Sequence, residues 1–132
     1  MSYYFATTTD LGFDEAIEHV TAALKEEGFG ILTEIDVAAT FKKKLDVDVP
    51  AYRILGACNP HFAYQALQAE DKIGTMLPCN VIVRDAGSGQ VEIAAVNPIA
   101  SMQAVDNEDL GEIAQEVRDR LQKVIDQIAV GV

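Results

Sequence analysis

Two short stretches decide the fold of this chain: YRILGACNP at residues 52–60 and LPCNVIV at residues 77–83. Each is apolar and has the length of a strand, and each contains one of the two cysteines, followed at once by an asparagine. Between them, apolar residues recur at helical spacing from Pro60, which suits a first helical turn, to Gly74. The pattern predicts a strand over residues 52–59, a helix up to Gly74, and a second strand over residues 79–85.

The residues before these stretches alternate between strand and helix patterns. Residues 3–9 favour a strand, and residues 13–24 favour an amphipathic helix that stops at Gly28. Residues 29–37 have period two, which predicts a strand with one apolar and one wet face. The apolar face should hold Phe29, Ile31, Ile35 and Val37, and the wet face Glu34 and Asp36. Residues 38–45 predict a short helix with a solvated lysine run, Lys42 to Lys44.

The residues after the second stretch predict a hairpin and a long helix. The turn Ala86-Gly-Ser-Gly89 joins the strand at 79–85 to an alternating strand at 91–95, so this pair should be antiparallel. After an apolar turn at 99–105, a helix capped by Asp106 or Asn107 should run to Ile128. The order β-α-β-α-β-α-β-β-α predicts a single α+β domain over residues 1–132, with helices packed on one face of a sheet.

Composition limits the function classes. The chain has 132 residues, 49% of them hydrophobic, and a net charge of −11. Because phosphate backbones bind clustered Lys and Arg, we expect no nucleic-acid partner. The N-terminus lacks the pattern of a signal peptide and no long apolar run occurs, so we expect a cytoplasmic protein without a membrane partner. The sequence identifies no cofactor.

The two cysteines leave several roles open. If their strands are antiparallel neighbours, Cys58-Asn59 and Cys79-Asn80 should meet at one end of the sheet. A thiol pair there could cycle to a disulfide, or bind a soft metal such as zinc or copper with His61 as third ligand. The alternative is that both cysteines are small hydrophobic residues in apolar strands.

Strand alternation also predicts a second surface. If the faces with Cys58 and Cys79 both turn toward the helices, the opposite face holds Arg53, Leu55, Asn59, Asn80, Ile82, Arg84 and Glu92. A mixed apolar and charged face of this kind suits a dimer contact or a ligand. Glu34, Asp36 and Arg53 would serve an enzyme only if they converge in a pocket.

The segments LTEIDV at 32–37, YRILGACNP at 52–60 and LPCNV at 77–81 resemble those of the bacterial and archaeal domain-of-unknown-function family 302. The resemblance covers almost the whole chain. It implies a fold similar to the TATA-binding-protein-like group, with a curved antiparallel sheet and helices on one side, and commonly a homodimer. It implies no established activity.

Three function hypotheses follow. The first is a homodimeric accessory module without catalytic activity that binds a small ligand or a protein near Cys58-Asn59 and Cys79-Asn80, with Arg53 and Arg84 as further contacts. The second is a thiol redox or soft-metal protein, which requires a lowered thiol pKa at Cys58 or Cys79. The third is a small-molecule enzyme of unknown reaction.

Overall fold

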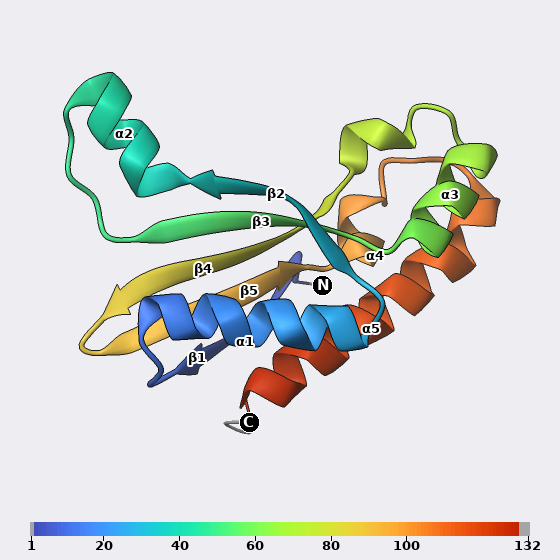
Figure 1. Cartoon of the computed structure of the whole chain (residues 1–132). Coiled ribbons are helices and arrows are strands. Elements are labelled where there is room, and N and C mark those ends of the chain that lie inside the picture. Colours follow the sequence, from blue (N-terminus) through green and yellow to red (C-terminus); the bar gives the residue numbers. More distant parts are fainter. Residues whose placement is uncertain (1, 130–132) are drawn as a thin grey trace.

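The computed structural model describes residues 2–129, which form a five-stranded sheet and a set of helices (Figure 1). The strands are β1 (Tyr4–Thr9), β2 (Gly30–Asp36), β3 (Tyr52–Cys58), β4 (Cys79–Gly87) and β5 (Gln90–Val96). The helices are α1 (Phe13–Glu26), α2 (Val37–Leu45), α3 (Pro60–Ala69), α4 (Pro98–Ser101) and α5 (Gly111–Ala129), with short 3₁₀ helices η1 (Ile73–Met76) and η2 (Glu108–Leu110). The predicted α+β class and element order are confirmed, with α4, η1 and η2 as additions.

The sheet has the strand order β1-β5-β4-β3-β2, and every neighbouring pair is antiparallel. Helices α1 and α5 cover one face of it (Figure 1). The opposite face is uncovered: Tyr4 on β1, Ile35 on β2 and Asn80 on β4 are all exposed there. The antiparallel sheet with helices on one face is therefore as predicted, whereas the likeness to the TATA-binding-protein-like group stays a prediction.

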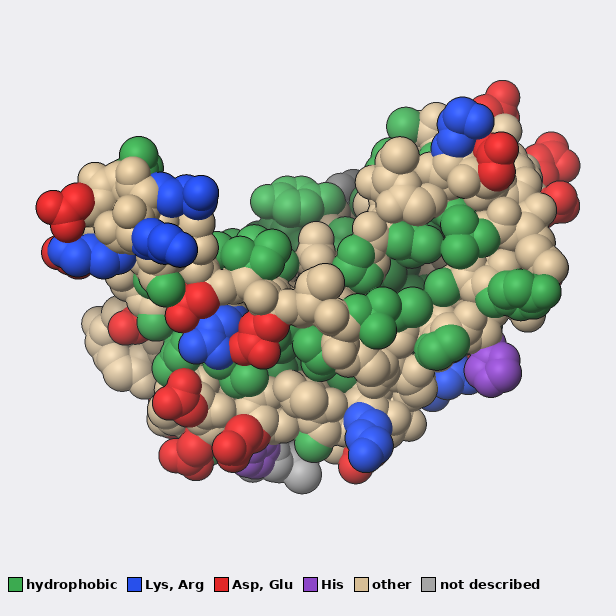
Figure 2. Space-filling view, turned by 45° about the horizontal axis from the view of Figure 1, so that its top comes forward, with side chains coloured by type: hydrophobic (Ala, Val, Ile, Leu, Met, Phe, Trp, Pro, Cys, Tyr) green, Lys and Arg blue, Asp and Glu red, His purple; other side chains and the backbone are tan. Residues whose placement is uncertain are grey.

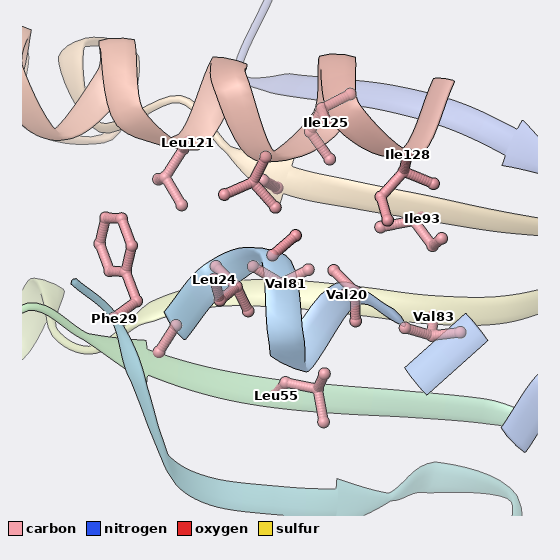
Figure 3. Packing of buried hydrophobic residues seen from close by; sticks show 14 of the residues in the cluster. Val20, Leu24, Phe29, Leu55, Val81, Val83, Ile93, Leu121, Ile125 and Ile128 are labelled. Atoms are coloured by element: carbon pink, nitrogen blue, oxygen red, sulfur yellow. The ribbon is translucent and has the colours of Figure 1, made fainter. Parts of the chain in front are cut away.

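The main core lies between the covered sheet face and the two long helices (Figure 3). Its members come from helix α1, helix α5 and the middle strands, and they include Val20, Leu24, Leu55, Val81, Ile93, Leu121 and Ile125. Burying such side chains contributes roughly 1.5–3 kcal/mol each, so this layer supplies most of the folding free energy. The apolar stripe of α5 is the one that its helical spacing predicts.

Strand β2 differs from its predicted alternation because it contains a bulge. The register with β3 shifts between Ile31 and Thr33, which makes Leu32 an extra residue. Ile31 therefore packs against the core, whereas Ile35 is 48% exposed on the uncovered face. Glu34 and Asp36 lie opposite Leu55 and Arg53, on the helix-covered side. The prediction that Ile35 shares a buried face with Phe29 and Ile31 is wrong, since one inserted residue reverses every side chain after it.

Helix α3 ends at Ala69, five residues before the predicted stop at Gly74. The side-chain amide of Asn107 donates to the Ala69 carbonyl at 2.8 Å, and Glu70 leaves the helix in an extended conformation. A long-range contact thus ends the helix, and the residues up to Gly74 continue as a turn and η1. Helix α2 projects beyond the sheet and has no buried residue (Figure 1).

Candidate functional site

The two Cys-Asn segments meet at one end of the sheet, as the sequence predicts. In the β3–β4 pair, Ala57 lies opposite Cys79 and Gly56 opposite Asn80. Since Ala57 and not Cys58 is the partner of Cys79, the two cysteines lie on opposite faces. Cys79 faces the helices and is buried, and Cys58 points to the other side and is half-buried. The prediction that both cysteines share the helix-covered face is wrong.

The residues predicted to share the face opposite the helices lie on both faces of the sheet, because the β3–β4 register differs from the expected one. Asn80, Ile82, Arg84 and Glu92 do lie on the uncovered face, where Arg84 is opposite Glu92 in the β4–β5 pair. The predicted β3 residues, Arg53 and Leu55, do not lie on this uncovered face. Leu55 is 1% exposed within the core, and Arg53 lies on the helix-covered side with its guanidinium over the Phe13 ring. Asn59 is buried at the end of β3.

A small apolar pocket lies between the end of the sheet and helices α3, α4 and α5. Of the predicted site residues, Cys58, Asn59 and Cys79 line it, together with apolar side chains such as Phe62 and Met102. Its volume is about 30 Å³. A water molecule needs roughly 10–15 Å³ of cavity volume, so the pocket has room for about two waters and not for an organic ligand.

Asn59 has a structural contact at the edge of this pocket. Its side-chain amide donates to the Glu27 carbonyl at 3.4 Å, and Arg120 donates to the same oxygen at 3.2 Å. The Arg120 guanidinium also lies over the Phe62 ring, 5.2 Å from its centroid. These contacts satisfy a carbonyl at the end of α1, which has no intrahelical partner. Sequence reasoning missed Arg120, because nothing local connects it to Glu27.

Burial moves the pKa of both thiols further above neutral pH than the ordinary value of 9.0. Desolvation raises the pKa of Cys79 to about 11, with a smaller contribution from the charge of Cys58. Burial also raises the pKa of Cys58. The thiolate is the nucleophile and the metal ligand, so the lowered pKa that the redox hypothesis requires is not found. Within residues 2–129 no three His, Cys, Asp or Glu side chains gather as a metal-binding group, and Cys58, Cys79 and His61 do not form one.

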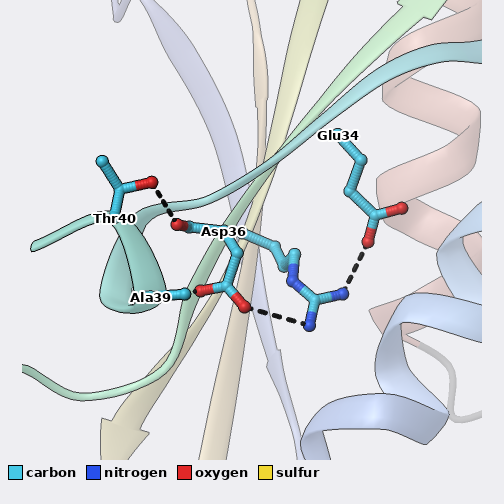
Figure 4. A network of polar contacts seen from close by, with 5 residues as sticks. Glu34, Asp36, Ala39 and Thr40 are labelled. Carbon is cyan, nitrogen blue, oxygen red and sulfur yellow. Dashed lines mark hydrogen bonds and ion pairs between the residues drawn. The ribbon is translucent and has the colours of Figure 1, made fainter. Parts of the chain in front are cut away.

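Arg53, Glu34 and Asp36 converge at the surface (Figure 4). Arg53 donates to Glu34 at 2.5 Å and to Asp36 at 3.5 Å. The hydrogen bond that Arg53 donates to Glu34 raises the pKa of Arg53, against the opposing effect of desolvation. Asp36 in addition caps α2 by accepting from the Ala39 amide at 2.9 Å. The single positive charge of Arg53 is therefore shared by two carboxylates, and the cluster joins β2, β3 and the start of α2.

The larger hollow is a groove on the uncovered sheet face, with a volume of about 430 Å³. It is lined by residues of β1, β3, β4 and β5 and by the segment before β1: Tyr3, Tyr4, Tyr52, Asn80, Ile82, Arg84, Glu92, Ala94, Ala95 and Val96. On its floor Arg84 donates from Nε to Glu92 at 2.7 Å. Of the predicted site residues, Asn80 and Arg84 are brought together here. Tyr3 and Tyr4 were missed, because only the sheet order places β1 near β4. Tyr52 was missed because it shares a side of β3 with Cys58, which was expected to face the helices.

The model of the family described as "Domain of unknown function DUF302" matches residues 5–128. The chain belongs to the DUF302 family. A crystal structure of an uncharacterized conserved DUF302 protein from Bacillus stearothermophilus is 28% identical to it and superposes with a TM-score of 0.88. That likeness covers 96% of this chain and 98% of the other. No curated protein matches the sequence.

The DUF302 match confirms the family resemblance that the strand segments carry. It assigns no activity. None of the helices within residues 2–129 combines the length and apolar character needed to cross a membrane.

The buried thiol of Cys79 should make stability depend on alkaline pH. Its folded-state pKa of about 11 lies above the ordinary value of 9.0, so its stabilising contribution is complete below pH 9 and is lost as pH rises to 11. The loss should be on the order of 2 kcal/mol. Urea unfolding at pH 8 to 11 should therefore show a flatter pH dependence for Cys79→Ala than for the native chain. Equal slopes for the two proteins would show that the thiol ionises as easily folded as unfolded.

Proposed function

We propose that this DUF302 domain is a binding module without catalytic activity of its own, and that the groove on its uncovered sheet face is the binding site. The groove volume of about 430 Å³ carries the proposal. Small-molecule sites in proteins have volumes of roughly 300–1,000 Å³. The pocket at Cys58 and Cys79, at about 30 Å³, is far below that range.

The lining of the groove has the character of a ligand site. Tyr3, Tyr4 and Tyr52 supply amphipathic aromatic walls, and Ile82 and Ala94, which lie opposite each other on β4 and β5, supply an apolar floor. Asn80, Arg84 and Glu92 are polar groups at defined places on this floor. Apolar area gives a ligand its affinity, and a few polar groups fix its orientation.

Two of the predicted site residues, Arg53 and Asn59, are occupied by structural contacts, which supports a binding role over catalysis. Arg53 is paired with Glu34 and Asp36, and Asn59 donates to a helix end. Burial raises the pKa of both thiols, whereas a nucleophile or general base requires a pKa near the working pH. Two free cysteines also suit the reducing cytoplasm, where we place the protein.

The partner we propose for the domain is a second copy, across the β2 edge of the sheet. The basic lobe is helix α2 with Lys42, Lys43 and Lys44, of which Lys42 is paired with Asp46 and Asp48. The acidic lobe is the α3–η1–η2 end with Glu70, Asp71, Asp106, Glu108 and Asp109, and it also contains Lys72, which pairs with Asp71. Figure 2 shows these lobes on the two sides of a hollow that has hydrophobic side chains on its floor. Strand β2 is the edge strand below it, and its Leu32 is 68% exposed.

A two-fold axis across this hollow places the basic lobe of each copy against the acidic lobe of the other. Such an isologous contact uses every complementary pair twice. The contact uses the β2 edge, whereas the groove residues other than Tyr52 of β3 lie on or next to β4, β5 and β1, so the groove stays open in this arrangement. Homodimerisation and ligand binding are therefore compatible in this proposal.

The groove proposal predicts where a small neutral aromatic molecule binds. Titration of the labelled protein with indole, followed by amide chemical shifts, should perturb Ile82, Ala94 and Val96. Ala94→Leu fills the floor of the groove and should abolish these changes, whereas Ala39→Leu on the exposed surface of α2 should not. Changes confined to Cys58 and its neighbours, or none at all, would contradict the proposal.

A further inference from the structure

We infer that the ligand of the groove is a zwitterionic amino acid with an aromatic or large apolar side chain. This inference rests on the proposed function, since it names the ligand class of the same site. It is carried by the ion pair of Arg84 and Glu92 in the groove floor and by the apolar surface that begins next to it.

The ion pair leaves most of its hydrogen-bonding capacity unused. Arg84 and Glu92 lie opposite each other on β4 and β5. One hydrogen bond joins them, from Nε of Arg84 to Oε1 of Glu92 at 2.7 Å. An arginine has five N–H donors, and no other protein atom within residues 2–129 bonds this guanidinium or the second carboxylate oxygen. The side chains are 41% and 27% exposed, so both are accessible from the groove.

The charges of the groove favour a ligand with both signs. Arg84 and Glu92 are the charged residues of its lining, so the groove itself is neutral within a chain of net charge −11. A ligand with only a carboxylate would gain from Arg84 and be repelled by Glu92, and a ligand with only an ammonium group would meet the reverse. An α-amino acid carries both groups on one carbon. Its carboxylate binds the free N–H groups of Arg84 while its ammonium donates to Glu92.

The apolar surface beside the ion pair accepts the side chain of such a ligand. The next pair along β4 and β5 on the same face is Ile82 with Ala94, one two-residue step, or roughly 7 Å, from the charged pair. Tyr52 lies opposite Arg84 on β3, and Tyr4 is opposite Val96 on β1, so aromatic rings border this floor on both sides. A phenyl ring attached to the zwitterion lies on Ile82 and Ala94 between these tyrosines.

The test compares L-phenylalanine with phenylacetate, which lacks the ammonium group, and phenethylamine, which lacks the carboxylate. Each is titrated into the labelled protein up to millimolar concentration, and the shifts of Ile82, Arg84, Glu92 and Ala94 are followed. We expect phenylalanine to bind at least about tenfold more tightly than either fragment, which corresponds to about 1.4 kcal/mol. A fragment that binds as tightly as phenylalanine overturns the inference.

Variants assign the effect to the ion pair. Arg84→Gln and Glu92→Gln should each weaken phenylalanine binding about tenfold, whereas Arg53→Gln, which removes an ion-paired arginine outside the groove, should leave it unchanged. Unchanged affinity in Arg84→Gln overturns the inference. If phenylalanine fails to bind while indole still shifts Ala94, the ligand class is wrong and the groove proposal stands. If neither binds, both fail.

Discussion

Replacing Gly56 by alanine is expected to destabilise the domain by about 3 kcal/mol, at the upper end of the cost of overpacking a core. Gly56 is buried in the middle of β3, and a Cβ atom there would lie 2.1 Å from Oγ1 of Thr33 and 2.7 Å from Cγ of Pro78. Thr33 is held by the pairing of β2 with β3, and the ring of Pro78 is rigid. Rotation of the Thr33 side chain can move its hydroxyl, but Cγ of Pro78 can withdraw only if the backbone at the start of β4 moves.

Urea unfolding of the variant gives this cost directly, provided that the slope of the transition is unchanged. Gly30→Ala is the matched control, because Gly30 also pairs with β3 and a Cβ atom there would have no neighbour within 4 Å. The control should differ from the native chain by no more than about 0.5 kcal/mol. If both glycine variants have the same stability, strands β2, β3 and β4 are packed less closely around Gly56 than the structure shows.

Reversing the charge of the basic lobe is expected to weaken self-association about a hundredfold. Lys43→Glu with Lys44→Glu replaces attraction by repulsion at both copies of the contact, and each exposed pair contributes roughly 0.2–1 kcal/mol. Lys42 is left in place because it already pairs with Asp46 at 2.9 Å. Light scattering over a dilution series measures the dissociation constant.

The acidic lobe offers the matched reversal, Asp106→Lys with Glu108→Lys, which should weaken the proposed homodimer to a similar extent; Asp71 is left in place because it pairs with Lys72. An equimolar mixture of the two variants should recover the native affinity, because one contact of the mixed dimer then has its charges exchanged and the other is native. Self-association that is unaffected by either reversal, or a mixture that fails to recover, would place the dimer contact elsewhere. An Arg84→Glu variant that weakens the dimer would place it on the uncovered face.

Local patterns were sufficient to predict most of the elements. The hairpin follows from its turn residues, since Gly87, Ser88 and Gly89 all adopt the positive φ that such a turn requires. Helix α5 follows from its apolar spacing, and the adjacency of the two Cys-Asn segments follows from antiparallel pairing of their strands. These features depend on residues that are close in sequence or on a single strand pair.

The faces of the sheet were less predictable, because they depend on register. The bulge at Leu32 reverses the side chains of Ile35 and Asp36, and a one-residue offset separates the faces of Cys58 and Cys79. Alternation within one strand shows which residues share a face and not which face meets the helices. The candidate site is therefore the groove and not the predicted site at the cysteines. Of the predicted site residues, Asn80 and Arg84 line this groove.

A crystal structure of the protein with bound indole would show directly whether the groove on the uncovered sheet face is the binding site. We expect electron density for the ring on the uncovered sheet face, in contact with Ile82 and Ala94 and bordered by Tyr4 or Tyr52. Density in the pocket beside Cys58 and Met102, with the groove empty, would contradict it and return the binding site to the two cysteines.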